Sequence, residues 1–190
     1  MNDAIQRTLA DLGRALRTPR IPFALVGGIA VAVRGNPRFT ADIDIVAAAD
    51  VEHAIGLLEQ LAATSFEPLF PEVEEIIRTA FIVPLRHRVT GVGVDMALGL
   101  TGFERDLIAR AEKVRFGRTS LPVARAEDLL LLKLTAGRPR DADDARGIVA
   151  RQGARLDWGY LLAVGAELSS ALAQDLVPQL YRLRGDAGEA

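Results

Sequence analysis

Two aspartates, Asp42 and Asp44, stand two residues apart in a short apolar segment, separated by Ile43 and followed by Ile45. Residues two apart on a β-strand point to the same face, so both carboxylates are expected on one face and both isoleucines on the other. Two carboxylates this close repel each other unless a cation lies between them. Mg2+ or Mn2+ prefers such oxygen ligands. The pair therefore predicts a divalent-metal site; a solvated acidic strand is the alternative, although Asp is depleted in strands.

A third acid, Asp95, interrupts the otherwise apolar residues 93–97. If its strand lies beside the strand of Asp42 and Asp44, three carboxylates converge on one patch. Such a set can hold two metal ions about 3.5–4 Å apart, which clamp the attacking and leaving oxygens of a phosphoryl displacement. A buried aspartate that bonds only to the backbone is the alternative.

The pair Gly27-Gly28 separates an apolar segment from a short helical pattern. Without side chains, the backbone N–H groups of such a turn can approach phosphate closely, and a helix N-terminus favours anions. Gly-Gly pairs are also common in ordinary turns. The pair Gly27-Gly28 is informative because of its position: it follows one expected strand and precedes the strand that carries Asp42 and Asp44.

Polar residues also fill the loop that leads to Asp42. Arg38 and the Thr40 hydroxyl are candidates to contact a triphosphate, and an ordinary polar loop is the equal alternative. Residues 86–88, Arg-His-Arg, end a later strand near Asp95. They are either a basic patch that faces a substrate or a solvated run.

These residues must be positioned by a mixed sheet. Strands are expected over residues 23–26, 42–47, 81–88 and 91–98, with a hairpin over 113–123. Helices are expected over residues 5–16, 29–34, 50–63, 103–112, 126–137 and 141–152, with two more between 158 and 183. The fold class is α/β (α+β): a mixed sheet flanked by helices, followed by a helical C-terminal region. The expected division is a core over residues 1–125 and a helical region over residues 126–190.

The bulk composition limits the function classes. The chain has 190 residues, of which 49% are hydrophobic and 25% charged, with a net charge of −2 and no cysteine. This charge gives no global basic field for nucleic acid, although a local basic patch remains open. Disulfides and thiolate metal sites are excluded. No apolar segment is long enough to span a bilayer, and no signal peptide is indicated, so the expectation is a cytoplasmic protein without a membrane partner.

The glycine pair and the acids together resemble a known signature. The segment Leu-Val-Gly-Gly over residues 25–28, then thirteen residues, then Asp-Ile-Asp-Ile over residues 42–45, is similar to that of the DNA polymerase beta-like nucleotidyltransferase superfamily. Asp95 falls where that superfamily places its third carboxylate. The resemblance implies a nucleotidyltransferase fold, an NTP substrate, and Mg2+ or Mn2+ held by the three aspartates. It also implies phosphate binding by the two glycines.

A later segment resembles the AbiEii group, nucleotidyltransferase-like proteins that include toxins of toxin–antitoxin systems. That group carries a Lys, then basic residues, then Asp-x-x-Asp, which Lys133, Arg140, Asp141 and Asp144 match. The resemblance implies that Lys133 offsets charge on the leaving pyrophosphate. A lysine that snorkels from a helix edge is the alternative. Asp141 and Asp144 either support the nucleotide site or cap a helix.

The expected activity is transfer of a nucleoside monophosphate from an NTP to an acceptor hydroxyl with release of pyrophosphate. The acceptor is an RNA, a protein or a small molecule. The resemblance to AbiEii proteins adds a toxin role with a cognate antitoxin protein as partner. Two alternatives stay open: a small-molecule, aminoglycoside-like nucleotidyltransferase, and a protein that binds nucleotide or a partner without turnover.

Overall fold

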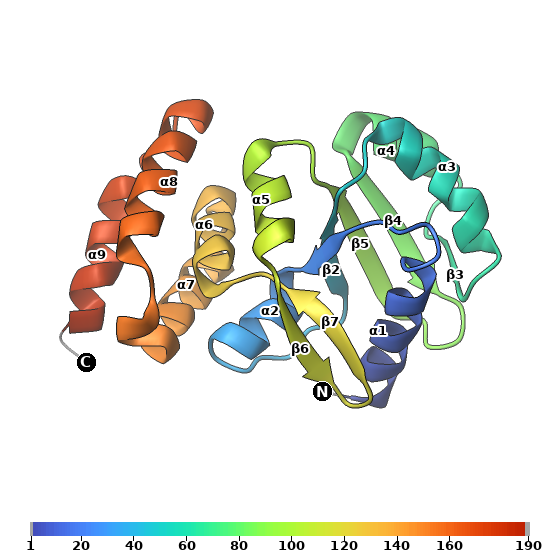
Figure 1. Cartoon of the computed structure of the whole chain (residues 1–190), viewed down its shortest axis with the longest axis horizontal. Coiled ribbons are helices and arrows are strands. Elements are labelled where there is room, and N and C mark those ends of the chain that lie inside the picture. Colours follow the sequence, from blue (N-terminus) through green and yellow to red (C-terminus); the bar gives the residue numbers. More distant parts are fainter. Residues whose placement is uncertain (1, 189–190) are drawn as a thin grey trace. The chain divides into compact units, whose positions relative to one another are not determined.

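The computed structural model describes the backbone of residues 2–188 and the side chains of residues 2–185 (Figure 1). The chain forms two compact units. The first comprises Met1–Ile29 and Phe39–Ala124, and the second comprises Ala30–Arg38 and Arg125–Ala190. The first unit carries the sheet and the second is helical. Helix α2 (Gly27–Arg34) contains the point where the chain first passes from one unit to the other.

All described strands of the first unit join one seven-stranded sheet in the order β3-β4-β5-β2-β1-β7-β6. Their bounds are β1 Phe23–Leu25, β2 Ile43–Ala47, β3 Phe66–Pro68, β4 Ile82–His87, β5 Gly93–Leu98, β6 Glu112–Phe116 and β7 Thr119–Val123. Strand β2 runs parallel to β5, and β1 runs parallel to β7, whereas the other neighbouring pairs are antiparallel. The mixed sheet expected from the sequence is confirmed.

The sequence of β2 explains its central position in the sheet. Ile43 and Ile45 are fully buried, and β2 pairs with β5 on one side and β1 on the other. Alternation along the strand turns Asp44 to the opposite face from the isoleucines. The same alternation holds in β5, where Val94 and Met96 are buried and Asp95 is exposed. Burial of the apolar residues therefore fixes the face that carries the acids.

Among the described residues, the first unit also contains the helices α1 Asp3–Ala15, α3 Val51–Ala62, α4 Val73–Ala80 and α5 Gly102–Arg110. Three of their starts follow capping chemistry, and on α1 the Asn2 side chain accepts a hydrogen bond from the Ile5 N–H. The Asp50 side chain accepts a hydrogen bond from the His53 N–H at the start of α3, and Thr101 and Glu104 form a capping box on α5. Helix α1 packs on β7, and α5 packs on β1 and β2. Helix α4 and strand β3 are present although the sequence patterns did not predict them.

The histidine of the Arg-His-Arg segment belongs to the core. His87 is fully buried, and its Nε2 lies 2.9 Å from Asp11 Oδ2 on α1. The Thr90 N–H donates to Nδ1 at 3.1 Å, so the ring proton stands on Nε2 and donates to Asp11. Arg86 and Arg88 both pair with Glu67. The interpretation of this segment as a substrate-facing basic patch is therefore wrong for His87.

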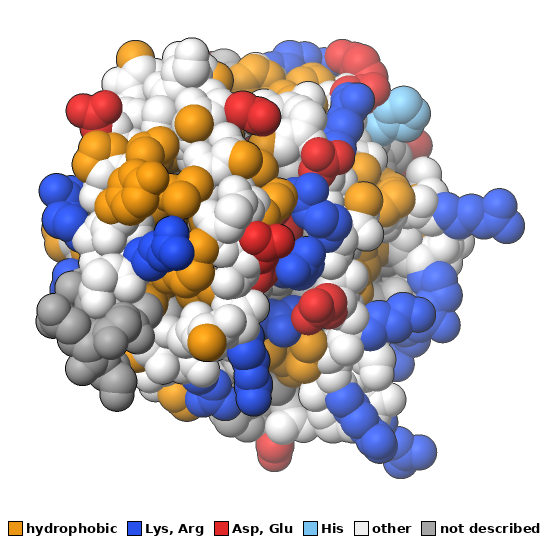
Figure 2. Space-filling model, turned by 60° about the vertical axis from the view of Figure 1, so that its left-hand side comes forward, with side chains coloured by type: hydrophobic (Ala, Val, Ile, Leu, Met, Phe, Trp, Pro, Cys, Tyr) orange, Lys and Arg blue, Asp and Glu red, His pale blue; other side chains and the backbone are white. Residues whose placement is uncertain are grey.

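The second unit consists mainly of helices, with the bounds α6 Ala126–Ala136, α7 Pro139–Gln152, α8 Trp158–Leu172 and α9 Val177–Gly188. Gly137 ends α6 in the left-handed conformation, with φ of 63°, as the sequence predicts for a helix terminus. Figure 2 brings α8 and α9 forward and shows apolar side chains on their surface, where Leu172 and Tyr181 are exposed. None of the described helices is long and apolar enough to cross a bilayer.

One face of α7 contacts residues 30–38, the segment from earlier in the chain that belongs to the second unit. Asp144, Gly147, Ile148 and Gln152 recur at helical spacing, which places them along one stripe. The Gln152 side chain donates to the Arg34 carbonyl at 2.5 Å, and Arg38 pairs with Asp144. These contacts explain why residues 30–38 join α7 in one unit, a division that the sequence patterns do not indicate.

Two glycine-to-alanine changes test this packing. A Cβ on Gly35 would lie 3.0 Å from the backbone N of Ile148, and backbone cannot move aside cheaply, so Gly35→Ala should lower the free energy of unfolding by about 1–3 kcal/mol. Gly56 lies in α3, where an added Cβ would meet nothing within 4 Å. Gly56→Ala should raise the free energy of unfolding by roughly 0.5–1 kcal/mol. Chemical denaturation measures both; equal effects of the two changes would contradict the packing.

Candidate functional site

Three aspartates lie at one end of the two central parallel strands. Asp44 and Asp95 stand directly opposite each other in the β2–β5 register. Asp42 immediately precedes β2, two residues before Asp44. Asp42 and Asp95 are exposed and Asp44 is half-buried. The predicted site required the strand of Asp95 to lie beside the strand of Asp42 and Asp44, and the two strands do pair. The pairing brings carboxylates from two segments together on one face of the sheet.

Glycines make room for these carboxylates. A Cβ on Gly27 would lie 1.8 Å from Asp44 Oδ2, and one on Gly93 would lie 2.8 Å from Asp42 Oδ1. Gly27 also has φ of 56°, which L side chains rarely adopt. The Gly28 N–H donates to Asp44 Oδ2 at 3.3 Å. The glycine turn therefore packs against the acids, and Gly93 is a site residue that the sequence patterns did not indicate.

The acids affect one another electrostatically. Desolvation raises the pKa of the Asp95 carboxyl above its ordinary value, and the negative charges of Asp44 and Asp42 raise it further. A nearby cation stabilises the ionised form of such a carboxyl group. Among the side chains of residues 2–185, no three acidic or histidine groups form a ready-made metal site. The donor set nevertheless fits a hard divalent cation, because it consists of carboxylate oxygens whose mutual repulsion a cation would relieve.

A second charged cluster lies within the second unit. Lys133 is only 6% exposed, and its Nζ lies 2.8 Å from Asp141 Oδ1 and 3.0 Å from Asp144 Oδ2. Arg38 binds Asp144 with two parallel bonds, Nε to Oδ1 at 2.9 Å and Nη2 to Oδ2 at 3.0 Å. A fork of this kind is the strongest common geometry for an arginine and a carboxylate. Both buried aspartates are thus compensated by cations.

Asp141 also caps the start of α7. Its Oδ2 accepts from the Arg138 Nε at 2.6 Å and from the Arg138 backbone N–H at 3.3 Å. Burial raises the pKa of Asp141, but the hydrogen bonds and charges of Arg138 and Lys133 outweigh it, so the net pKa is lowered. The helix-capping alternative for Asp141 is therefore realised. A role in supporting the nucleotide site stays a prediction.

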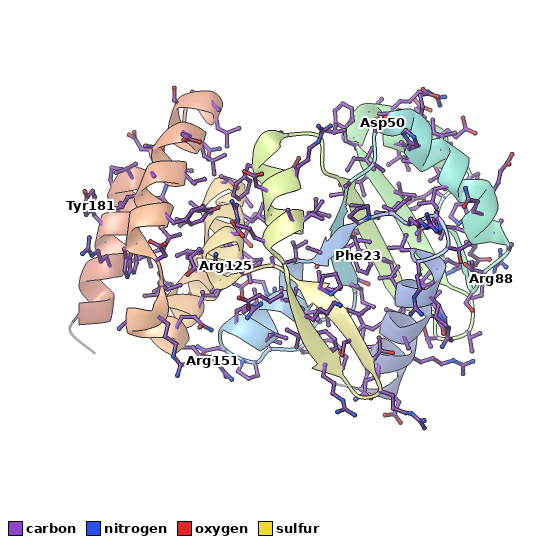
Figure 3. All side chains as sticks on the ribbon, in the orientation of Figure 1. Phe23, Asp50, Arg88, Arg125, Arg151 and Tyr181 are labelled. Atoms are coloured by element: carbon purple, nitrogen blue, oxygen red, sulfur yellow. The ribbon has the colours of Figure 1, made fainter. Side chains whose placement is uncertain are left out.

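The other predicted nucleotide contacts are more peripheral. The Thr40 hydroxyl donates to the Asp42 carbonyl at 3.0 Å, which holds the loop that leads into β2. Arg140 is exposed in the first turn of α7. Figure 3 shows the side chains along the ribbon, with Arg125 and Arg151 marking α6 and α7 in the second unit. Contact of Arg38, Thr40, Lys133 or Arg140 with a nucleotide stays a prediction.

Residues 5–177 match the protein family described as nucleotidyltransferase of unknown function (DUF6036). The chain belongs to this family. A comparison with curated proteins finds no match. The family description names neither a toxin nor an antitoxin, so the narrower resemblance to the AbiEii group stays a prediction.

Solved structures of nucleotidyltransferases share the fold of this family member. An antigenic nucleotidyltransferase-like protein from Paracoccidioides brasiliensis is 18% identical with a TM-score of 0.55, over 92% of this chain and 94% of its own. The antibiotic-resistance factor ANT(2'')-Ia is 13% identical with a TM-score of 0.60, over 91% and 97%. A complex of ANT(2'')-Ia with adenylyl-2''-tobramycin gives 13% and 0.54, over 97% of each chain. The predicted nucleotidyltransferase fold is confirmed.

Removal of the buried cation should destabilise the second unit. Lys133→Met leaves two buried carboxylates with one partner fewer, so the free energy of unfolding should fall by about 3–5 kcal/mol. Arg151 is exposed in the last turn of α7, and Arg151→Met should change it by less than about 0.5 kcal/mol. Denaturant unfolding followed by circular dichroism measures both. A Lys133→Met protein as stable as Arg151→Met would show that the cluster is not needed for folding.

The raised pKa of Asp95 makes a prediction about pH. The folded protein keeps a proton on Asp95 to a higher pH than the unfolded chain, so its stability falls as pH rises from the ordinary pKa through the raised one. Asp95→Asn removes this loss. In EDTA at pH 7 its melting temperature should exceed that of the wild-type protein, and the difference should shrink below the ordinary pKa. A difference that does not change with pH would contradict the electrostatic origin.

Proposed function

We propose that this protein transfers a nucleoside monophosphate from an NTP to an acceptor hydroxyl and releases pyrophosphate. The observation that carries the proposal is the set of three aspartates, Asp42, Asp44 and Asp95, on one face of β2 and β5 beside the glycine turn. Membership of a nucleotidyltransferase family supports the same reaction class.

In the proposed reaction the acceptor oxygen forms a bond to the α-phosphorus while the bond from that phosphorus to the bridging oxygen of pyrophosphate breaks. Asp42, Asp44 and Asp95 would hold Mg2+ or Mn2+. A divalent cation bound there would neutralise phosphate charge. Asp95 is exposed and lies opposite Asp44, so its carboxylate would accept the proton that leaves the acceptor hydroxyl.

The remaining residues would position the nucleotide. Gly27 and Gly28 would admit the phosphates close to the backbone, because no side chain stands in front of Asp44. Thr40 would keep Asp42 in place through its carbonyl. The proposed contact of Arg38, Lys133 and Arg140 with the triphosphate and the leaving pyrophosphate, with Asp141 and Asp144 orienting Lys133, rests on the sequence alone. In the second unit Lys133 pairs with both aspartates and Arg38 pairs with Asp144. Catalysis of this kind consists of positioning and charge neutralisation.

The acceptor is proposed to be an RNA, a protein or a small molecule. The net charge of −2 gives no general attraction to RNA. The likeness to ANT(2'')-Ia, which has been solved with an adenylylated tobramycin, supports a small-molecule acceptor as the second candidate. The toxin role and the antitoxin partner rest on the resemblance of residues 127–144 to the AbiEii group.

The decisive experiment incubates the purified protein with Mg2+ and each of four α-32P-labelled NTPs. The acceptor in separate reactions is total cell RNA, a protein extract or an aminoglycoside. Label should appear on one acceptor class, and Asp44→Ala and Asp95→Ala should each lower the rate by at least about 100-fold, because charge stabilisation of the reacting phosphate is lost.

Asp106→Ala is the matched control, since it removes an exposed aspartate from α5. It should transfer label at the wild-type rate. Wild-type rates in Asp44→Ala and Asp95→Ala would rule out the mechanism. Nucleotide binding without label on any acceptor would favour the alternative of a protein that binds nucleotide without turnover.

A further inference from the structure

A cavity of about 490 Å³ lies in the first unit at the ends of β2 and β5 that are opposite to the aspartates. Ala48 and Ala49 follow β2, and Gly99 follows β5; all three line the cavity. The buried side chain of Leu57 on α3 adds to its apolar wall. Asp50, at the start of α3, marks this region in Figure 3. The cavity is therefore separate from the proposed active site, although the same strands build both.

Two arginines line this cavity without an internal partner. Arg20 precedes β1 and Arg105 lies on α5. Within the described residues, neither guanidinium makes an ion pair or a hydrogen bond. The acid beside them, Asp50, already accepts bonds from the backbone N–H of His53 at 2.8 Å and from its ring Nδ1 at 2.9 Å. Asp50 makes no ion pair with either arginine, so the cavity lining carries two guanidinium groups and one carboxylate.

The backbone of Arg20 is also unusual. Its φ is 55°, in the left-handed region that glycine adopts far more easily than a residue with a Cβ. It lies in the turn that ends α1, where the Ile21 N–H donates to the Leu16 carbonyl at 3.2 Å. Glycine is the preferred residue at such a helix terminus. Glycine would therefore strain the backbone less at residue 20, which indicates that the arginine side chain has a role beyond the turn.

We propose that this cavity binds a small molecule that carries a phosphate or carboxylate group. Guanidinium groups match the geometry of both oxyanions with paired hydrogen bonds. Pockets for small molecules span roughly 300–1,000 Å³ and combine apolar walls with a few polar groups, as this one does. Arg20 and Arg105 would bind the oxyanion, and the alanines, Gly99 and Leu57 would contact the rest of the molecule.

The test uses the full-length, 15N-labelled protein titrated separately with inorganic phosphate and with succinate. Backbone amide resonances of Ala49, His53 and Gly99 report on the cavity. At least one probe should shift them in a saturable way. Arg20→Gly and Arg105→Ala should each weaken the binding about tenfold or more. Arg20→Gly should keep or raise the melting temperature, because glycine removes the left-handed strain.

Arg17→Ala is the matched control, because it removes the same charge from the same turn without touching the cavity. It should bind the probe as tightly as the wild-type protein. A response to phosphate alone assigns a phosphorylated ligand, and a response to succinate alone assigns a carboxylate. The proposal is overturned if neither probe shifts these amides, or if Arg20→Gly and Arg105→Ala bind as tightly as Arg17→Ala.

Discussion

The carboxylate of Asp44 occupies space that any side chain at residue 27 would need. This close approach ties together the end of β1, the start of α2 and the acidic strand β2, because only a glycine in the left-handed conformation can turn the chain there. Gly93 makes the corresponding room for Asp42 on the neighbouring strand. Asp44 and Asp42 thus each lie against a residue without a side chain, and Asp42 remains exposed.

Negative charge is handled differently in the two units. In the second, Asp141 and Asp144 are buried, and Lys133, Arg38 and Arg138 compensate them at hydrogen-bonding distance. In the first, partial desolvation and the charges of two neighbouring carboxylates raise the pKa of Asp95. A cluster that is internally compensated stabilises one arrangement of helices, whereas one that lacks compensation gains most from a bound cation. The contrast supports a structural part for the cluster of the second unit and a chemical part for the aspartates of the first.

Much of the first unit could be predicted because its signals are local. Alternation around Asp44 and Asp95 revealed both strands, and Asp50 marked a helix start through capping chemistry, as Gly137 marked a helix end in the second unit. Strand β3 has only three residues, so it carries no periodic pattern. The pairing of Arg38 with Asp144 joins residues 106 positions apart. No local pattern encodes such a contact, and for the same reason the sequence assigned Arg38 and Asp144 separately to a nucleotide.

The order of synthesis gives this long-range pair a further meaning. Residues 30–38 emerge from the ribosome early, but the face of α7 that receives them is made about a hundred residues later. At roughly 5–20 residues per second, the segment waits for several seconds before its partner exists. Its polar contacts with α7 are made by the Arg34 carbonyl and the Arg38 guanidinium, groups that water solvates well until α7 exists. The second unit can therefore fold completely only after α7 has been synthesised, although part of it was made about a hundred residues earlier.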